Sequence, residues 1–281
     1  MNKICDLHTH SVYSDGTYTP AEIIDEAIRN GLSAVALTDH NTVDGLPSFI
    51  AAAVGKDIEI VPGAEFSVDH NGIELHILGL FITPEHFDKV AKLMSDVNRK
   101  KEESNIVLIE SLSRAGYPLN YEEIKAKTPN GMINRSQIAD ALIEKGYFSS
   151  KNECFNSILS PQAGHYKEPK RLTALEIISF IKSINALPVL AHPFLDENEK
   201  EKILDFLPQA KKQGLVGIEC YYSTYSEKDT EELIQVAEHL GLVCSGGSDF
   251  HGKAKHGIEL GSGYGNLKIP YECYTKLKAL L

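Results

Sequence analysis

The stretch that decides the fold spans residues 4–11 and reads ICDLHTHS. A short apolar run ends there in two histidines, His8 and His10, which are two positions apart. Residues two apart in an extended segment point to the same face, so both imidazoles can bind one ion. Imidazole and carboxylate groups are common ligands of zinc, manganese and iron. A lone His-x-His pair also occurs in ordinary strands, so the rest of the chain has to decide between the two interpretations.

The composition is that of a globular protein and argues against some classes of function. The chain has 281 residues, of which 42% are hydrophobic and 24% are charged. This length suffices for one large α/β domain or for one domain with an insertion. The formal net charge of −11 argues against a protein that wraps long nucleic acid by neutralising phosphates. The negative net charge does not exclude a small phosphorylated substrate, because bound divalent ions can reverse the sign of the local electrostatic field.

Cysteine usage and hydropathy predict the cellular compartment of the protein. The five cysteines form no Cys-x-x-Cys pair, and their number is odd. This pattern predicts buried free thiols in a reducing cytoplasm rather than a disulfide framework. No apolar run approaches membrane-spanning length, and the first residues lack the apolar core of a signal peptide. We therefore expect a cytoplasmic protein without a membrane segment.

Strands and helices alternate from the first residues to about residue 83. Residues 19–22 read TPAE, a helix start with a Thr cap, Pro at the first position and Glu three residues after the cap. Predicted strands over 33–37 and 58–62 are each followed by polar residues, and Asn71-Gly72 predicts a hairpin turn. The segment supplies six candidate ligands of a metal: His8, His10, Asp15, His40, Glu65 and His76.

The pattern changes at residue 84 and resumes at residue 173. Residues 84–172 are almost wholly helical and polar in character, which predicts an inserted helical cap subdomain. Arg135 and Lys167 in this segment could bind a phosphate of the substrate, although a solvated surface charge is the commoner role of either residue type. Residues 1–83 and 173–281 are predicted to form the barrel.

The second half of the predicted barrel offers more imidazole and carboxylate groups. The strand over 187–191 is followed by His192, and the last strand, 242–244, leads to Asp249 and His251. In barrels of parallel strands the carboxyl ends gather on one face, where active sites form. A single histidine on a strand is more often a hydrogen-bonded core residue than a ligand. Six histidines at this position, with three carboxylates among them, favour a metal centre.

Five motifs together resemble those of the PHP (polymerase and histidinol phosphatase) family. They are DLHTHS at 6–11, LTDHNT at 37–42, GAE at 63–65, AHP at 191–193 and GSDFH at 247–251. The helical insertion is similar to that of the stand-alone nucleotide phosphatases and 5′→3′ exoribonucleases of this family. The resemblance implies an α/β fold, a distorted (β/α)7 barrel with an inserted helical subdomain. It also implies two to three divalent transition-metal ions, usually Mn, Fe or Zn.

The resemblance also implies a ligand set. The ligands of a first ion are His8, His10, Glu65 and Asp249. Glu65 bridges to a second ion, which is completed by His76 and His192. The ligands of a third ion are Asp15, His40 and His251. Through these ions, Glu65, His192 and Asp249 are expected to be catalytic. Asp6 and Asp39 are expected to accept hydrogen bonds that orient the imidazoles.

Two departures from the family pattern concern the substrate. Asn41 stands where the subgroup often has Asp, and the residues NRSQ at 134–137 replace a more usual GRPH. Arg135 keeps the arginine of that motif, whereas Gln137 lacks its imidazole. The implied metal chemistry is therefore closer to the family pattern than the implied substrate.

The sequence thus predicts a metal-dependent phosphoesterase that acts by metal-bound hydroxide. The expected substrates are AMP-like nucleotides, 3′,5′-bisphosphonucleotides or short 5′-phosphorylated oligonucleotides, with Arg135 and Lys167 as substrate contacts. A phosphatase of another small metabolite such as histidinol phosphate is an alternative, and a non-enzymatic metal-binding regulatory module is another. The sequence leaves open the metal, the oligomeric state and the group that protonates the leaving alcohol.

Overall fold

A computed structural model of the protein describes residues 3–128, 133, 135–167, 169 and 172–281. Contacts divide the chain into two compact units. The first consists of Met1–Ala91 and Leu172–Leu281, and the second of Lys92–Arg171. The subdomain predicted over 84–172 spans this second unit, and its role as a cap stays a prediction.

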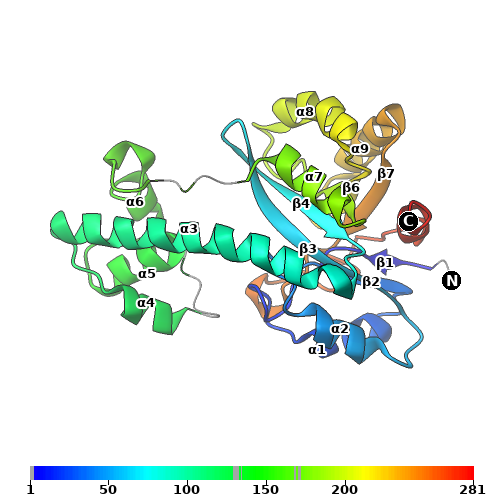
Figure 1. Cartoon of the computed structure of the whole chain (residues 1–281), viewed down its shortest axis with the longest axis horizontal. Helices are drawn as coiled ribbons and strands as arrows, with labels where there is room; N and C mark the ends of the chain where they lie inside the picture. The colour runs from blue at the N-terminus through cyan, green and yellow to red at the C-terminus, as the bar shows by residue number, and fades with distance from the viewer. Residues whose placement is uncertain (1–2, 129–132, 134, 168, 170–171) are drawn as a thin grey trace. The chain divides into compact units, whose positions relative to one another are not determined.

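The first unit is built around one sheet of seven strands, in which each strand pairs with the next one along the chain (Figure 1). The strands are β1 (Cys5–Asp6), β2 (Ala34–Leu37), β3 (Glu59–His70), β4 (Ile73–Leu80), β5 (Leu187–Leu190), β6 (Gly217–Tyr222) and β7 (Val243–Gly247). The predicted α/β barrel is confirmed, because the last strand returns to the first.

Backbone hydrogen bonds join β1 and the residues after it to β7. The amide of Leu7 donates to the carbonyl of Gly246 at 3.0 Å, and the amide of Asp249 donates to the carbonyl of His8 at 3.0 Å. The approach is close: a Cβ atom added to Gly247 would lie 2.1 Å from the Cβ of His8. Only glycine fits there, so the motif containing Gly247 closes the barrel as well as carrying Asp249.

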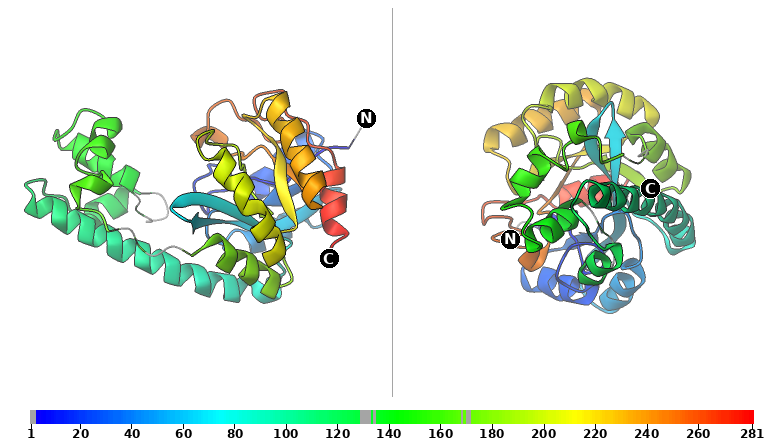
Figure 2. Two further views of the ribbon diagram at one scale, coloured as in Figure 1. Left: turned by 90° about the horizontal axis from the view of Figure 1, so that it is seen from above. Right: turned by 90° about the vertical axis from the view of Figure 1, so that its left-hand side faces the viewer.

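One strand runs against the others. β4 is antiparallel to β3 and to β5, whereas all other neighbours are parallel. The predicted hairpin turn lies between β3 and β4, with positive φ angles of 53° at Asn71 and 85° at Gly72. The hairpin extends beyond the other strands (Figure 2).

The antiparallel strand corrects one expectation. Because His76 comes after an apolar run, we expected it at the carboxyl end of a parallel strand. The structure places it elsewhere. It lies within β4 and pairs in register with Ser67 of β3. Because β4 runs in the opposite direction, a residue near its beginning reaches the same end of the barrel as the carboxyl ends of β1, β2 and β5.

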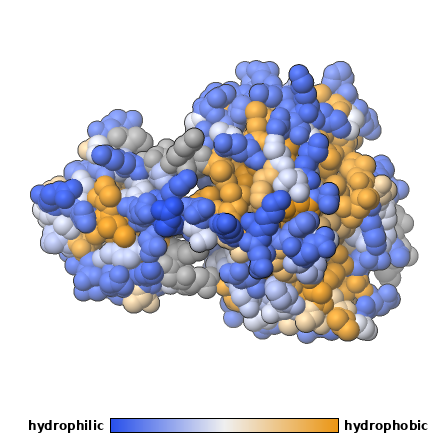
Figure 3. Space-filling view, viewed as in Figure 1, coloured by the Kyte–Doolittle hydropathy of each residue, from blue (hydrophilic) through white to orange (hydrophobic). Residues whose placement is uncertain are grey.

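Helices pack their apolar faces around this sheet. They are α1 (Pro20–Arg29), α2 (Leu46–Ala53), α7 (Ala174–Ser183), α8 (Lys200–Gln213), α9 (Glu227–Leu240) and α10 (Glu272–Lys278). Two short 3-10 turns, η1 (Pro84–His86) and η4 (Gly252–Ala254), contain no buried residue. The predicted start of α1 is confirmed, since Thr19 and Glu22 form a capping box. The outward side of α8 is hydrophilic (Figure 3), while Ile203, Phe206 and Leu207 are buried.

The barrel interior is filled by small and medium apolar side chains. One buried cluster includes Leu7, Ala36, Val61, Leu78 and Val189. The five cysteines are free thiols, as predicted, and all except the half-buried Cys244 are buried. Among the described residues, no helix is both long and apolar enough to cross a membrane.

The second unit is helical. Its elements are α3 (Phe87–Arg114), which begins in the first unit, α4 (Tyr121–Lys127), α5 (Arg135–Glu144), α6 (Lys151–Asn156) and η3 (Pro161–Ala163). A separate buried cluster that includes Leu108, Leu112, Ile138 and Leu142 holds these helices together. This part of the chain therefore has a hydrophobic core of its own.

Gly247→Ala should destabilise the barrel. The added methyl group would lie 2.1 Å from the Cβ of His8 and 2.7 Å from its backbone nitrogen, so the backbone itself has to move. Overpacking of this kind costs about 1–3 kcal/mol or more, measurable as a loss in the free energy of unfolding in urea. Ser245→Ala in the same strand is the control, because within the described residues the buried Ser245 hydroxyl has no hydrogen-bond partner. Equal stability of the Gly247 variant and wild type would contradict the closure described above.

Candidate metal centre

All nine predicted ligand side chains lie in the first unit and meet at one end of the barrel. Their nitrogen and oxygen atoms form four overlapping groups, and within each group all these atoms lie within 4.8 Å of one another. The groups are His10–Asp15–His40–His251, His8–His10–Asp249, His8–Glu65–His192 and His40–Glu65–His76. Six imidazoles and three carboxylates are thus brought together from seven separate places in the sequence.

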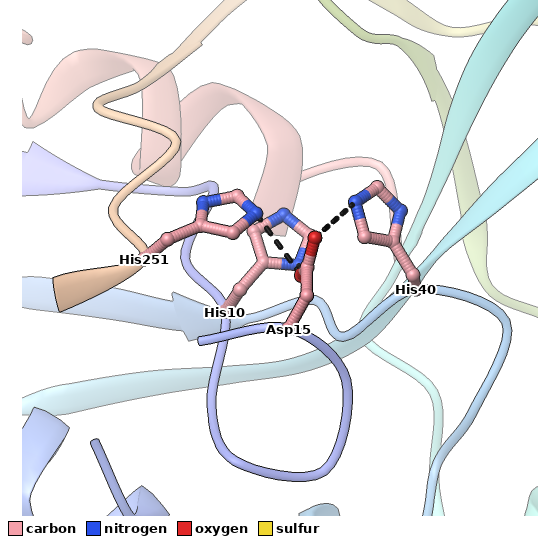
Figure 4. Close-up of side chains that lie close together, drawn as sticks. All are labelled: His10, Asp15, His40 and His251. Carbon is pink, nitrogen blue, oxygen red and sulfur yellow. Dashed lines mark ion pairs between the residues drawn. The ribbon is translucent and has the colours of Figure 1, made fainter. Parts of the chain in front are cut away.

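Asp15 links the imidazoles of the first group. Figure 4 shows its carboxylate between His251 and His40, with His10 beside it. The Oδ1 atom is 3.1 Å from Nε2 of His251, and the Oδ2 atom is 3.8 Å from Nε2 of His40. Nδ1 of His10 lies 3.9 Å from Oδ1. The arrangement provides one carboxylate and three ring nitrogens around a common centre.

Glu65 lies at the centre of the other groups. Its side chain is buried on β3, and its two oxygens face different histidines. Oε2 is 2.9 Å from Nδ1 of His40, 3.2 Å from Nε2 of His10 and 3.3 Å from Nε2 of His8. Oε1 is 2.7 Å from Nδ1 of His76 and 3.1 Å from Nε2 of His192. The two oxygens therefore contact different sets of imidazoles, and the role of Glu65 as a bridge between two ions stays a prediction.

Backbone strain occurs at two of these residues, His192 and Asp249, and at Asn41, which follows His40. Asn41, His192 and Asp249 have positive φ angles of 52°, 27° and 56°. Residues other than glycine seldom adopt this region, at a cost of about 1–3 kcal/mol each. All three follow strand ends, where the chain has to turn sharply.

The two flanking aspartates do not act as expected. Asp39 accepts hydrogen bonds from the amide and hydroxyl of Ser11, at 2.7 and 2.6 Å, and from the hydroxyl of Ser14 at 2.6 Å. Asp6 accepts from the amide and hydroxyl of Ser248, and from the amide of Gly261. The recorded bonds of both go to serines and backbone amides rather than to imidazoles. Asp39 therefore orders the loop that carries Asp15, and Asp6 ties β1 to the segment before Asp249.

The carboxylate that orients an imidazole is Glu219, which our sequence interpretation missed. It is fully buried on β6, and its Oε1 is 3.1 Å from Nδ1 of His8. The signal was present, since Glu219 follows an apolar run just as the other candidates do. Asp249 also has partners that we did not predict: its Oδ2 accepts from the hydroxyl of Tyr222 at 2.7 Å and pairs with the ammonium of Lys255.

Asn41, the first departure from the family pattern, has a structural role. Its Oδ1 accepts from the amide of Ser67 at 3.2 Å, and its Nδ2 donates to the hydroxyl of Ser67 at 3.4 Å. That hydroxyl lies 3.4 Å from Nε2 of His76. Asn41 therefore acts on the cluster through Ser67, which holds the outer side of the His76 ring.

The charges in the cluster reinforce one another. Burial alone would raise the pKa of Glu65, but His40, His76 and His8 hold that pKa well below its usual range. Burial opposes a charge on His76, yet the Glu65 carboxylate raises the pKa of His76 to about 10. Carboxylates that stay ionised in a buried site attract cations strongly.

Unpaired atoms in the cluster indicate what the site would hold. Within the described residues, the buried atoms His40 Nδ1, Glu65 Oε2 and His251 Nε2 have no hydrogen-bond partner of acceptable geometry. Two of them, His40 Nδ1 and Glu65 Oε2, are only 2.9 Å apart. Buried polar atoms are almost always paired, so exceptions need an explanation. Imidazole nitrogens and carboxylate oxygens are ligands of transition metals, and this donor set fits such ions.

Comparison with known proteins agrees with this geometry. A family model described as the PHP domain matches residues 6–156, which is more than half of the chain. The chain belongs to the PHP domain family. A 3′,5′-nucleoside bisphosphate phosphatase of Chromobacterium violaceum is 30% identical over 91% of this chain and 90% of its own length.

Other PHP relatives cover the chain equally well. A 5′-3′ exoribonuclease of Haemophilus influenzae is 28% identical over 89% of this chain and 91% of its own length. A solved structure from Chromobacterium violaceum, described as an amidohydrolase with bound sulfate and no metal, is 28% identical. It superposes with a TM-score of 0.77 over 98% of this chain and 96% of that chain. The predicted family and the predicted class, a hydrolase of phosphate esters, are confirmed.

The predicted substrate contacts lie in the second unit. The Arg135 guanidinium lies over the ring of Tyr166, 4.4 Å from its centre, and Lys167 is exposed. Asn134 of the departing motif is outside the described residues, and Gln137 lies in α5. The assignment of Arg135 and Lys167 as phosphate contacts stays a prediction.

Asp39→Asn should destabilise the metal-free protein. Asp39 is buried and accepts hydrogen bonds from the Ser11 amide and from the hydroxyls of Ser11 and Ser14. In the Asn variant, the side-chain NH2 group is itself a donor and would face one or more of these donors. Loss of hydrogen bonds to a charged group costs about 1.5–3 kcal/mol, seen as a lower free energy of unfolding in urea. The exposed Asp44→Asn should change stability by less than about 0.5 kcal/mol. Similar values for both variants would argue against the role of Asp39 in ordering the loop.

Proposed function

We propose that this PHP protein is a metal-dependent phosphoesterase whose substrates are nucleotides with a terminal phosphate. The observation that carries the proposal is the Glu65 carboxylate, which faces five imidazoles at distances of 2.7–3.3 Å. Such a cluster is suited to two or three divalent ions held side by side. Mn, Fe and Zn all accept ligands of this kind.

The proposed ligands follow the family pattern and are supported by the distances. His8, His10 and Asp249 form one group, and Glu65 Oε2 lies within 3.3 Å of both histidines. A second ion would be held by Glu65 Oε1, His76 and His192. A third would be held by Asp15, His40 and His251, which form a group together with His10.

The chemistry of such ions suits the hydrolysis of phosphate esters. Divalent ions lower the pKa of water into the neutral range and offset negative charge on phosphoryl oxygens. The residues of the chain fix the positions of these charges. Asp249 directs Oδ1 into the cluster because Tyr222 and Lys255 hold Oδ2. Lys255 also adds a positive charge at the edge of a site that is otherwise rich in carboxylates.

The nucleotide substrate is supported by the relatives. The two named enzymes act on a nucleoside bisphosphate and on RNA, both of which are phosphate esters of nucleosides. We therefore favour 3′,5′-bisphosphonucleotides, AMP-like nucleotides or short 5′-phosphorylated oligonucleotides over histidinol phosphate. The net charge of −11 opposes binding of long duplexes.

Metal analysis combined with a substrate panel tests the proposal. The purified protein should contain two to three transition-metal ions, and a chelator should abolish phosphate release until Mn, Fe or Zn is restored. Glu65→Gln should lose at least 10–100-fold in turnover and in metal affinity, because it removes the shared carboxylate. The exposed Glu231→Gln is the matched control. Full activity without bound metal, or a clear preference for histidinol phosphate over nucleotides, would overturn the proposal.

Arg135→Ala tests the predicted contact with a second phosphate. The guanidinium offers a planar, permanently charged fork, and losing its hydrogen bonds to a phosphate costs about 1.5–3 kcal/mol. The KM for a 3′,5′-bisphosphonucleotide should therefore rise roughly ten- to a hundred-fold, with little change for an aryl phosphate. Arg135→Lys keeps the charge without the fork, so its KM for the bisphosphonucleotide should lie between those of wild type and Arg135→Ala. Lys167→Ala should raise this KM by less than Arg135→Ala does. An equal rise in KM for both substrates would contradict the assignment of Arg135 as the contact of a second phosphate.

A further inference from the structure

Glu219 is a buried carboxylate that no family motif above includes. It lies on β6 and is completely inaccessible to solvent. The pairing of β6 with β7 shifts register between Glu219 and Tyr221. A buried carboxylate is costly unless hydrogen bonds satisfy its oxygens, and each oxygen of Glu219 has one short contact.

The first contact is to the ring of His8. Oε1 of Glu219 lies 3.1 Å from Nδ1 of His8, and both side chains are buried. On the other side of the ring, Nε2 lies 3.0 Å from Nε2 of His10 and 3.3 Å from Oε2 of Glu65. A proton on Nδ1 that is donated to Glu219 leaves the lone pair on Nε2, the atom that faces the cluster.

The second contact is to the backbone of His192. Its amide donates to Oε2 of Glu219 at 2.7 Å. His192 has a φ angle of 27°, a conformation that a residue with a side chain adopts only when its surroundings enforce it. The hydrogen bond holds this turn, and the turn brings Nε2 of His192 to 3.1 Å from Oε1 of Glu65.

Both contacts serve the same part of the site. His8 and His192 are the two imidazoles of the His8–Glu65–His192 group. The hydrogen bonds recorded for Glu219 in the described part of the chain go to these two residues. They do not extend to the group on the other side, which is formed by Asp15, His40 and His251 with His10.

We propose that Glu219 is a positioning residue that selects the metal-binding tautomer of His8 and fixes the backbone of His192. It thereby sets the affinity of the ions on the His8–His192 side of the cluster. The inference rests on the proposed metal centre. The new element is that the affinity of ions on this side of the cluster is set independently of ions on the side of Asp15, His40 and His251.

The chemistry of glutamine makes the inference testable. Glu219 faces two N–H donors, whereas a glutamine side chain has one acceptor oxygen and one NH2 donor. The amide N–H of His192 cannot be reversed, so the oxygen of Gln has to accept from it. The NH2 group then faces Nδ1 of His8 and favours the tautomer with the proton on Nε2. That proton occupies the atom that would bind an ion.

Glu219→Gln should therefore weaken binding of at least one ion by about 10–100-fold and leave at least one other ion unchanged. The measurement is a titration of the metal-free protein with zinc against a competing chelator. In ¹⁵N-histidine spectra of the zinc-loaded protein, the Nδ1 proton of His8 should be present in wild type and lost in the variant. Neither readout depends on turnover.

Two further variants serve as controls. Asp15→Asn should weaken a different ion, so the double variant should lose both, with effects that add. The exposed Glu231→Gln should match wild type in the titration and in the spectra. If Glu219→Gln does not fold, Glu219→Asp keeps the charge but is too short to hold both contacts, and it should weaken the same ion.

The results separate the two proposals. Wild-type protein that binds none of zinc, manganese and iron in such titrations would overturn the proposed function. Wild-type protein that binds two or three ions, with unchanged affinities and an unchanged His8 spectrum in the folded Glu219 variant, would overturn only the role of Glu219.

Discussion

The structure of the site depends on one buried charge, the carboxylate of Glu65. Its side chain is 1% exposed and is surrounded by imidazoles from four other segments of the chain. A buried carboxylate without cations nearby is expensive, and here the surrounding histidines keep it ionised. Removal of this charge would leave the imidazoles facing one another. Glu65 therefore orders the side chains of the site, in addition to its proposed role as a metal ligand.

The barrel brings the partners of Glu65 to it in two different ways. The carboxyl ends of parallel strands supply His8 and His192, and the antiparallel hairpin supplies His76 from the opposite direction. The backbone adds a third link, since the amide of Asn41 donates to the carbonyl of Glu65 at 2.8 Å. Closure of β1 against β7 then fixes Asp249 beside His8 and His10, which follow β1. A site of this kind needs the whole barrel, because three of the four groups combine side chains from three different segments, and the fourth, His8–His10–Asp249, forms only where β7 closes against β1.

The partners of the ligands divide the site into two sides. Asp39 orders the loop of Asp15 through Ser11 and Ser14, whereas Glu219 holds His8 and His192. Loss of a hydrogen-bond partner of a metal ligand commonly lowers metal affinity by about 10–100-fold. In the proposed metal centre, ions on the two sides would therefore differ in affinity, and loading of the cluster would follow that difference.

The sequence by itself determined the strand–helix order, the hairpin at Asn71-Gly72 and the nine imidazole and carboxylate groups of the cluster. These features are encoded locally, by apolar runs, caps, turn residues and polar residues at strand ends. Only the tertiary structure decided that His76 arrives on an antiparallel strand and that Glu219, rather than Asp6 or Asp39, faces an imidazole. Hydrogen-bond partners far apart in sequence leave no local pattern, because their pairing depends on register and on the closure of the barrel.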